Sequence, residues 1–383
     1  MSAQANGPEY YIGLMSGTSV DAIDCALIDT ANNQVRLHCA TTFPIPDKIT
    51  NDIHRLCADG KSANLHDVAK SDVAIGRLMA DAALNLLAEC QLDKKNILAI
   101  GSHGQTVFHS PHGKYPYTLQ IGDPNIIAEK TGITTVADFR RRDIAAGGEG
   151  APLVPLFHHH AFHSDKENRV ILNIGGIANI TILPASKHRT VTGFDTGPGN
   201  TLMDQWTLLH KGKPMDTHGT FAAAGSVDDA LLQSLLSDDY FSRPAPKSSG
   251  REYFNLDWLR SYLINGNIEA EHIQATLCQL TATSIINAIR KNAPDTDAIF
   301  VCGGGCHNPV LMSALRAEAK DISIEDTQHL NIDPDWVEAI TFAWLAKNTL
   351  QGQTGNLPSV TGARSAVILG GIYPGKGSGS PIA

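Results

Sequence analysis

The sequence lacks several features that would place it quickly in a common class of protein. It has no long basic run and its formal net charge is −9. Nucleic acid is therefore not an expected partner, because phosphate backbones select clusters of Lys and Arg. No apolar run is long enough to cross a bilayer, and residues 1–11 show no basic start followed by an apolar stretch. Neither a membrane anchor nor a signal peptide is expected.

Two nucleotide-binding motifs are also missing. The sequence contains no GxxxxGK[ST], which excludes a P-loop enzyme, and no GxGxxG at a suitable strand–helix junction. A small anionic substrate is still compatible with the acidic composition, because its site needs only one or two local cations.

Cysteine usage gives no sign of a disulfide framework. The seven cysteines are odd in number and irregular in spacing, and several stand in apolar runs as small core residues. Reduced thiols and a cytoplasmic location are expected. Cys302 and Cys306 flank three glycines but do not form CxxC, and no Cys or carboxylate spacing completes a zinc set around residues 158–160, which are all histidine.

The chain is long enough for two domains, with 383 residues of which 42% are hydrophobic. Residues 10–44 read as three strands with a turn rich in small residues, and residues 169–200 repeat that pattern. Helices and strands alternate after each, as in the helical periodicity of 66–92. A glycine- and proline-rich stretch at 143–157 separates the halves. The predicted fold class is α/β, with two similarly built lobes around a cleft.

Four glycine-rich turns follow apolar strands. They are MSGTS (15–19), NIGGIAN (173–179), DTGPGN (195–200) and CGGGCHN (302–308). Glycine lets the backbone turn sharply and present N–H groups to an anion, and a following helix start adds partial positive charge. We predict nucleotide-phosphate binding at 17–19, 195–199 and 303–305. At 175–176 a phosphate contact and a plain turn both stay open.

Longer strings, in order along nearly the whole chain, give a specific resemblance. They are GLMSGTSVDAID (13–24), SHGQTVFH (102–109), LQIGDPNIIAEKTG (119–132), VADFRRRDIAAGGEGAPLVP (136–155), NIGGIANIT (173–181), GFDTGPGNTLMD (193–204), VCGGGCHNPVLM (301–312), EAITFAWLA (338–346) and PSVTGA (358–363). Together they closely resemble the anhydro-N-acetylmuramic acid kinase family, within the superfamily of sugar kinases, heat-shock chaperone ATPases and actin.

The resemblance implies two actin-like (ribonuclease H-like) lobes around a nucleotide and substrate cleft. We expect the first lobe to comprise residues 1–140 with a C-terminal segment of about 360–383, and the second to comprise 141–359. It also implies a homodimer.

The resemblance further implies ATP and Mg²⁺ as cofactors and 1,6-anhydro-N-acetylmuramic acid, from cell-wall turnover, as substrate. Water attacks C1, the anhydro bridge opens, and the released O6 takes the γ-phosphoryl group. The product is N-acetylmuramic acid 6-phosphate.

Such a reaction needs a base near C1, and Asp195, which opens DTGPGN, is the expected base. The alternative for Asp195 is a turn or capping aspartate. Glu338 is expected to help hold the water or the sugar, and its alternative is a solvated glutamate in the first turn of a helix.

The same resemblance implies the nucleotide site. Its expected residues are Gly17, Thr18, Ser19, Val20, Asp21, Ala22, Ile23, Asp24, Gly175, Gly197, Gly199, Asn200, Gly303, Gly304, Gly305 and Asn308. Asp21 and Asp24 are expected to contact the metal. Ala22 stands where the family usually has glycine; a positive φ there would cost about 1 kcal/mol, and an ordinary φ nothing.

Substrate contacts are expected from three motifs. Arg140 and Arg142 share a face if residues 140–142 are a strand, and could pair with the lactyl carboxylate of the sugar. A solvated turn is the alternative, and the sequence does not choose among Arg140, Arg141 and Arg142. His103 and Gln105 are expected in the cleft rather than the core. Asp123 could bind sugar hydroxyls or cap the helix that follows.

Two other functions remain. A kinase of the same superfamily could act on a free sugar hydroxyl, and only motif resemblance separates it from the anhydro-sugar kinase. A chaperone or filament ATPase could use the same core, but the motifs SHGQT and DFRRRD would then have no purpose.

Overall fold

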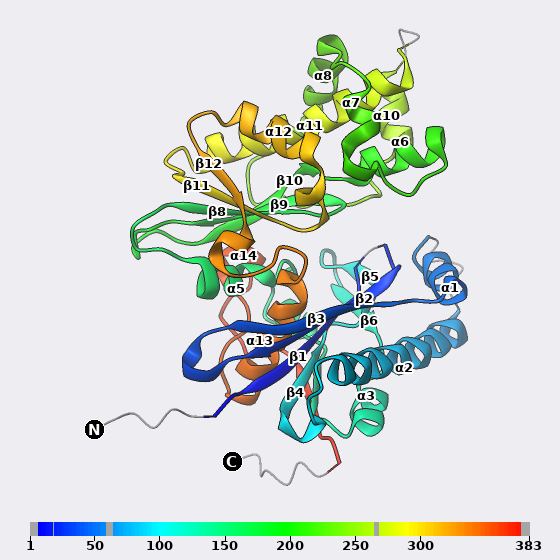
Figure 1. Cartoon of the computed structure of the whole chain (residues 1–383), viewed down its shortest axis with the longest axis vertical. Helices are drawn as coiled ribbons and strands as arrows, with labels where there is room; N and C mark the ends of the chain where they lie inside the picture. The colour runs from blue at the N-terminus through cyan, green and yellow to red at the C-terminus, as the bar shows by residue number, and fades with distance from the viewer. Residues whose placement is uncertain (1–6, 18, 59–63, 264–267, 377–383) are drawn as a thin grey trace. The chain divides into compact units, whose positions relative to one another are not determined.

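The computed structural model describes residues 7–17, 19–58, 64–263 and 268–376 (Figure 1). The chain divides into two compact units. Unit 1 comprises Met1–Phe157 and Trp336–Ala383, and unit 2 comprises His158–Asp335. Within the described ranges, no helix is both long and apolar enough to cross a membrane.

Unit 1 is built on a six-stranded sheet of order β13-β7-β4-β1-β2-β3. Its strands are β1 (Tyr10–Met15), β2 (Ala22–Asp29), β3 (Arg36–Pro44), β4 (Ile97–Ser102), β7 (Thr135–Ala137) and β13 (Gly371–Tyr373). The first three pair antiparallel, whereas β4 runs parallel to β1 and β7 parallel to β4. A separate hairpin joins β5 (Gln105–Ser110) and β6 (Tyr117–Ile121).

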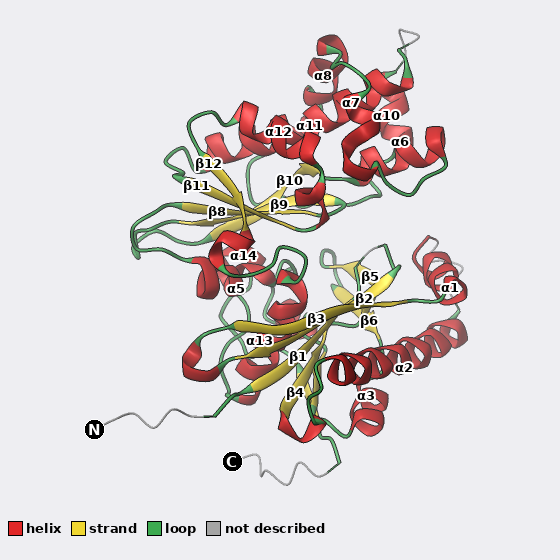
Figure 2. Ribbon diagram, in the orientation of Figure 1, coloured by secondary structure: helices red, strands yellow, loops and turns green. Residues whose placement is uncertain are grey.

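Helices cover both faces of the unit 1 sheet. The helices of unit 1 are α1 (Asp47–Ala58), α2 (Leu65–Glu89), α3 (Pro124–Thr131), α4 (Arg141–Ala145), α5 (Val154–Phe162, which continues into unit 2), α13 (Val337–Leu350) and α14 (Pro358–Thr361). Helix α2 lies along the unit 1 sheet (Figure 2), and its residues Ile75 and Met79 belong to the same buried cluster as Ile12 and Leu14 of β1. Gly13 lies between them and faces α13, because side chains alternate along a strand.

Unit 2 contains a five-stranded sheet of order β10-β9-β8-β11-β12. Its strands are β8 (Arg169–Ile174), β9 (Ile177–Leu183), β10 (Thr192–Pro198), β11 (Ala298–Cys302) and β12 (Ser323–Asp326). Its helices are α6 (Thr201–Lys211), α7 (Thr220–Ala223), α8 (Asp229–Leu236), α9 (Asp239–Ser242), α10 (Leu256–Tyr262), α11 (Ala270–Asn292) and α12 (Pro309–Glu318). Buried residues of α11, such as Leu280 and Ile285, form the core with Leu172 of β8.

The two sheets repeat one topology. In each, an antiparallel three-strand meander is followed by two strands parallel to the first, which gives the order third-second-first-fourth-fifth. The predicted α/β class with two similarly built actin-like lobes is confirmed.

The predicted domain boundaries need correction. The units divide after Phe157 and after Asp335, instead of after residues 140 and 359. Helix α13 belongs to unit 1 because it crosses β1 and β4 at two glycines. A Cβ on Gly13 would stand 1.8 Å from the Ala339 carbonyl oxygen, and one on Gly101 would stand 2.0 Å from that of Phe342.

A buried carboxylate also joins residues 140–150 to the segment after α13. Asp143 is completely buried. Its Oδ1 accepts from Asn356 Nδ2 at 2.6 Å and from Thr361 Oγ1 at 2.7 Å, and its Oδ2 accepts from the Gly150 N–H at 2.8 Å. The glycine- and proline-rich stretch at 143–157 is therefore part of the packed unit 1 and does not separate the two units.

The expectation of reduced thiols is wrong for one pair of cysteines. Cys39 of β3 and Cys90, which follows α2, are disulfide-bonded. No local pattern predicts this pair, because its members are brought together only when α2 packs on the sheet. Cys25, Cys57, Cys278 and Cys306 are free thiols in the described part of the chain.

Candidate functional site

The predicted site residues of unit 1 follow the ends of its parallel strands. Residues 16–21 follow β1, residues 103–105 follow β4 and residues 138–142 follow β7. Because these three strands are parallel neighbours, their carboxyl ends lie at one edge of the sheet. Ligands of open α/β sheets bind at this edge.

Helix α1 braces the first glycine turn. Thr50 Oγ1 donates a hydrogen bond to the Val20 carbonyl at 2.7 Å, and His54 Nε2 lies 3.1 Å from the Ser19 carbonyl oxygen. Ser19 Oγ donates to Asp21 Oδ1 at 2.5 Å. The turn is therefore held from behind by α1, while Ser19 and Asp21 are exposed.

The backbone conformation at position 22 does not require glycine. Ala22 begins β2 and is not among the residues with positive φ, so the family's glycine is not needed there. The left-handed residue is instead Val20, with φ 56°, a costly conformation for a β-branched side chain. Gly17 accepts from the Val20 N–H at 3.3 Å. Thr18 lies outside the described residues.

The last residues of the first motif belong to β2. The Ile23 side chain is completely buried, so any contact with a nucleotide would have to come from its main chain. Asp24 accepts from Thr42 Oγ1 at 3.2 Å. Within the described ranges, neither Asp21 nor Asp24 belongs to a group of three clustered metal-ligating side chains. Mg²⁺ keeps several waters and needs few protein ligands, so their metal role stays a prediction.

Arg140 and Glu338 are the charged residues of the unit 1 site, and His103 contacts Arg140. Arg140 Nε donates to His103 Nε2 at 2.9 Å, and Nη1 donates to the Gly150 carbonyl at 2.8 Å. Burial lowers the pKa of Arg140 to about 10, and the negative charges of Glu338 and Asp143 oppose that shift. Arg140 is therefore a partly buried cation with Glu338 in its field.

The His103 imidazole is neutral. Its Nε2 accepts from Arg140, so Nδ1 carries the proton and donates to the Gly104 carbonyl at 2.8 Å. Burial, and next the charge of Arg140, lower the pKa of His103 well below 6.5. The ring packs on Phe342 with centroids 4.7 Å apart, and only 4% of the residue is exposed. His103 is thus a core residue that positions Arg140.

Gln105 and Asp123 are also tied into the fold. Gln105 is buried and its Oε1 accepts from Ser16 Oγ at 2.7 Å, which links the turns after β4 and β1. Asp123 caps α3, as its Oδ1 accepts from the Asn125 N–H at 2.9 Å. The capping alternative therefore describes Asp123. A cavity of about 250 Å³ is lined by His103 and by both chain neighbours of Asp123.

The pairing of Arg140 with Arg142 on one face is wrong. Residues 141–145 form α4, and Arg140 is its N-cap. Two residues of helix turn by about 200°, so alternation along a strand does not apply. Arg140 is partly buried, whereas Arg141 and Arg142 are exposed, as the solvated-turn alternative describes. Arg140 is the arginine that the fold holds in place.

The glycine turns of unit 2 converge at the end of β8. The Asn200 N–H donates to the Gly175 carbonyl at 2.8 Å, and the Gly199 N–H donates to the Gly176 carbonyl at 3.0 Å. A Cβ on Gly199 would stand 2.4 Å from the Gly175 oxygen, so this close approach requires glycine. Gly197 lies on a β-bulge of β10 beside this contact.

The third glycine turn of unit 2, which follows β11, also lies at the end of β8. Gly303 has φ 78°, and a Cβ there would stand 2.3 Å from Asn173 Oδ1. A Cβ on Gly305 would stand 2.3 Å from the Ile174 side chain, while Gly304 has open space around it. The turn therefore folds directly over the end of β8.

Asn308 has a structural role at the start of α12. Its Oδ1 accepts from the Val310 N–H at 3.1 Å and from the Leu311 N–H at 3.2 Å, which is the bonding pattern of an N-cap.

Asp195 is fixed by the segment that follows α9. Its Oδ2 accepts from the Ser249 N–H at 2.9 Å, and its own N–H donates to the Lys247 carbonyl at 3.0 Å. Its carbonyl accepts from the Tyr240 hydroxyl at 2.8 Å. These three hydrogen bonds, two from the segment after α9 and one from Tyr240 within α9, hold both the main chain and the carboxylate, which is the rigidity that a catalytic base needs.

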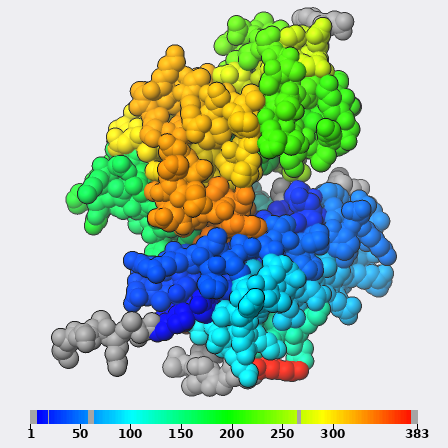
Figure 3. Space-filling model, in the orientation of Figure 1, coloured from blue at the N-terminus to red at the C-terminus, as the bar shows by residue number. Residues whose placement is uncertain are grey.

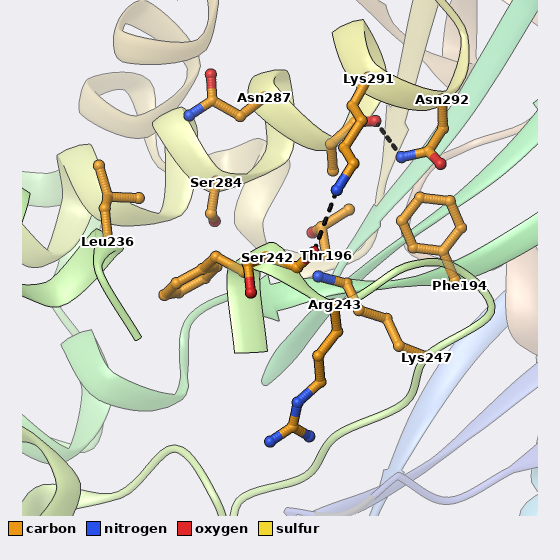
Figure 4. A pocket seen from close by; sticks show the side chains of 12 residues that line it. Phe194, Thr196, Leu236, Ser242, Arg243, Lys247, Ser284, Asn287, Lys291 and Asn292 are labelled. Carbon is orange, nitrogen blue, oxygen red and sulfur yellow. Dashed lines mark hydrogen bonds between the residues drawn. The ribbon is translucent and has the colours of Figure 1, made fainter. Parts of the chain in front are cut away.

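A cavity of about 250 Å³ lies behind this strand (Figure 4). Phe194 and Thr196 line it, whereas Asp195 between them does not. Side chains alternate across a strand, so the Asp195 carboxylate lies on the other face of β10. The cavity is therefore not the place where Asp195 acts.

Two lysines that line this cavity donate hydrogen bonds to main-chain carbonyl oxygens. Lys291 Nζ donates to the Ser242 carbonyl at 3.2 Å (Figure 4). Lys247 Nζ donates to the Tyr240 carbonyl at 2.8 Å. Burial, and next the charges of Lys291 and Arg243, lower the pKa of Lys247 to about 8. Both ammonium groups brace the end of α9, and through it the backbone of Asp195.

Sequence reasoning missed a cation at the Gly175–Gly176 turn. The Arg251 guanidinium lies over Gly176, where a Cβ would stand 3.2 Å from its Nε. Burial raises the pKa of nearby Asp204 to about 6, and the charge of Arg251 opposes that shift. Arg251 stands in no recognisable motif, so no local signal could have found it.

Two α/β units of one topology, with glycine turns at the carboxyl edge of their parallel strands, define an actin-like protein. The family model described as anhydro-N-acetylmuramic acid kinase matches residues 9–375. The chain belongs to the anhydro-N-acetylmuramic acid kinase family.

Curated relatives match over almost their full length. A protein of Coxiella burnetii (strain Dugway 5J108-111) named anhydro-N-acetylmuramic acid kinase is 49% identical, over 96% of this chain and 98% of its own. Proteins of the same name from Photobacterium profundum and Shewanella sp. (strain MR-4) are 48% and 50% identical, each over 96% of this chain and 99% of their own.

Proposed function

We propose that this protein is an ATP-dependent kinase that opens 1,6-anhydro-N-acetylmuramic acid and phosphorylates O6 in cell-wall recycling. The similarity to named relatives across nearly the whole chain supports this substrate. The observation that carries the chemistry is the Asp195 carboxylate, held by the Ser249 N–H at 2.9 Å with its main chain fixed on both sides.

In the proposed reaction, Asp195 takes one proton from water while the water oxygen bonds to C1. The C1–O6 bond breaks, and the other water proton stays on the new C1 hydroxyl. O6 bonds to the γ-phosphorus of ATP, whose bond to the β–γ bridging oxygen breaks. The products are N-acetylmuramic acid 6-phosphate, ADP and the proton that Asp195 received.

Arg140 is the proposed partner of the lactyl carboxylate, because arginine matches a carboxylate with two parallel hydrogen bonds. His103 orients it through the 2.9 Å hydrogen bond to Nε. Glu338, which acts electrostatically on Arg140, is proposed to help hold the sugar or the attacking water. Gln105 is proposed to contact the sugar, because its side chain is held beside Ser16 at the end of β1.

The proposed phosphate contacts are the glycine turns of each unit, at residues 17–19, 175–176, 197–200 and 303–305. Arg251 adds a cation to the second of them. Mg²⁺ would neutralise phosphate charge, and Asp21 and Asp24 are the proposed residues that hold it, directly or through water. We also propose that the enzyme is cytoplasmic and a homodimer.

The test is ADP release from Mg-ATP in the presence of either 1,6-anhydro-N-acetylmuramic acid or N-acetylglucosamine. The proposal expects turnover with the anhydro sugar. Turnover with N-acetylglucosamine alone would favour the other candidate, a kinase of the same superfamily that acts on a free hydroxyl.

A further inference from the structure

Three metal-ligating side chains meet on the surface of unit 2, beside the glycine turn that follows β11. Cys306, His307 and Asp335 each offer one ligand atom, and these atoms all lie within 4.8 Å of one another. His307 Nε2 and Asp335 Oδ1 are 2.7 Å apart. Within the described residues, this is the one group of three or more such side chains.

The main chain holds these residues together independently of their side chains. Cys306 and His307 end the short 3₁₀ helix Gly304–His307, and Asp335 follows Pro334. The Gly303 N–H donates to the Pro334 carbonyl at 3.0 Å, so the two segments are joined where the ligand atoms converge.

The ligand types favour zinc over magnesium. A thiolate, an imidazole and a carboxylate are ligands that Zn²⁺ accepts, whereas Mg²⁺ takes oxygen ligands. Zinc bonds of about 2.0–2.3 Å in a tetrahedron place ligand atoms about 3.3–3.6 Å apart. Atoms already within 4.8 Å reach that spacing with side-chain adjustments of about 1 Å.

The cluster is accessible and lies among negative charges. The side chains of His307 and Asp335 are 58% and 43% exposed. The chain around these residues is part of the orange surface in Figure 3. Asp326 and Asp333 also lie close enough to act electrostatically on Cys306. An ion can therefore enter from solvent and keep a water as its fourth ligand.

We propose that Cys306, His307 and Asp335 form a zinc site that fastens the glycine turn after β11 to the segment before α13. Its ligand set joins two adjacent residues of the glycine turn, Cys306 and His307, to Asp335, which lies 28 residues beyond His307. His307 and Asp335 exchange their mutual hydrogen bond for bonds to one ion.

The test uses the full chain, reduced with a phosphine, stripped of metal and titrated with Co²⁺ as a spectroscopic probe for zinc. We expect a sulfur-to-cobalt charge-transfer band that saturates at one equivalent and disappears when Zn²⁺ displaces the cobalt. Cys306→Ser should abolish the band. The matched control is Cys57→Ser, which removes an exposed cysteine of unit 1 and should leave the band unchanged.

Asp335→Asn provides a second measurement at an exposed position that does not threaten folding. Zinc affinity, measured by competition with a chromophoric chelator, should fall by about tenfold or more. A wild-type titration without a band, a band that survives Cys306→Ser, or an unchanged zinc affinity in Asp335→Asn would each overturn the proposed site.

Discussion

Arg140 donates its Nε–H to Nε2 of His103 at 2.9 Å, so a buried imidazole acts as the acceptor that orients a partly buried guanidinium. The arrangement requires His103 to stay neutral. Protonation of His103 at Nε2 would remove the acceptor of this hydrogen bond and place two positive charges next to each other.

The neutral state of His103 makes stability depend on pH. Its pKa is well below 6.5 in the folded chain and returns to about 6.5 on unfolding, so the unfolded chain binds the proton first. The contribution of neutral His103 to the free energy of unfolding is fully present above about pH 6.5. It is lost as the pH falls below that value, by up to about 1.4 kcal/mol for each pH unit.

Denaturant unfolding at about pH 5 and about pH 7.5 measures this loss. His103→Gln should reduce the difference between the two conditions, although His158 and His109, whose pKa values are also lowered, contribute in the same direction. His112→Gln, at a side chain that is 74% exposed, is the control. Equal pH dependence in His103→Gln and wild type would contradict the neutral acceptor.

Asp195→Asn should lower the turnover number by about 10²–10⁴-fold, because the amide keeps the shape of the carboxylate but cannot take a proton. Binding of ATP, measured by calorimetry without sugar, should be unchanged. Asp257→Asn, at a carboxylate that is 89% exposed, serves as the control. Near-normal turnover in Asp195→Asn would remove this residue from the role of base.

Arg251→Met should weaken ATP binding by about tenfold, because one hydrogen bond to a charged group contributes about 1.5 kcal/mol or more. Calorimetry with a non-hydrolysable ATP analogue measures the change directly. Arg260→Met removes an exposed arginine of the same unit and should bind the analogue as the wild type does. If both variants bind equally well, the guanidinium over Gly176 does not contact phosphate.

Gly13→Ala should destabilise unit 1 by about 3 kcal/mol, because the new Cβ would stand 1.8 Å from the Ala339 carbonyl and the main chain of α13 cannot give way cheaply. The free energy of unfolding measures this. Gly7→Ala, where a Cβ meets nothing within 4 Å, should change it little. If Gly13→Ala left the free energy of unfolding unchanged, α13 would not cross β1 as closely as described.

Local patterns predicted much of the fold. The apolar periodicity of residues 66–92 predicted the helix found at Leu65–Glu89, and the Asp-Pro pair at 123–124 predicted the capped start of α3. Strand order and the pairing of Cys39 with Cys90 depend on distant contacts, so no local pattern carried them. The domain boundary was missed for the same reason, because two glycines on β1 and β4 assign α13 to unit 1.

The candidate site was predicted where glycine turns end strands, and missed where an isolated side chain arrives from elsewhere. Gly175, Gly199 and Gly303 converge at β8, as turns at the carboxyl edge of a sheet must. Arg251 and Asp335 come from separate segments that carry no motif. The misassigned face of Arg140 and Arg142 came from reading a short helix as a strand.

The measurement that tests the central claim most directly is the mass of the phosphorylated product from 1,6-anhydro-N-acetylmuramic acid and Mg-ATP. The account predicts the mass of N-acetylmuramic acid 6-phosphate, in which one water has been added and O6 carries the phosphoryl group. A product that has gained a phosphoryl group but no water would contradict ring opening by water at C1.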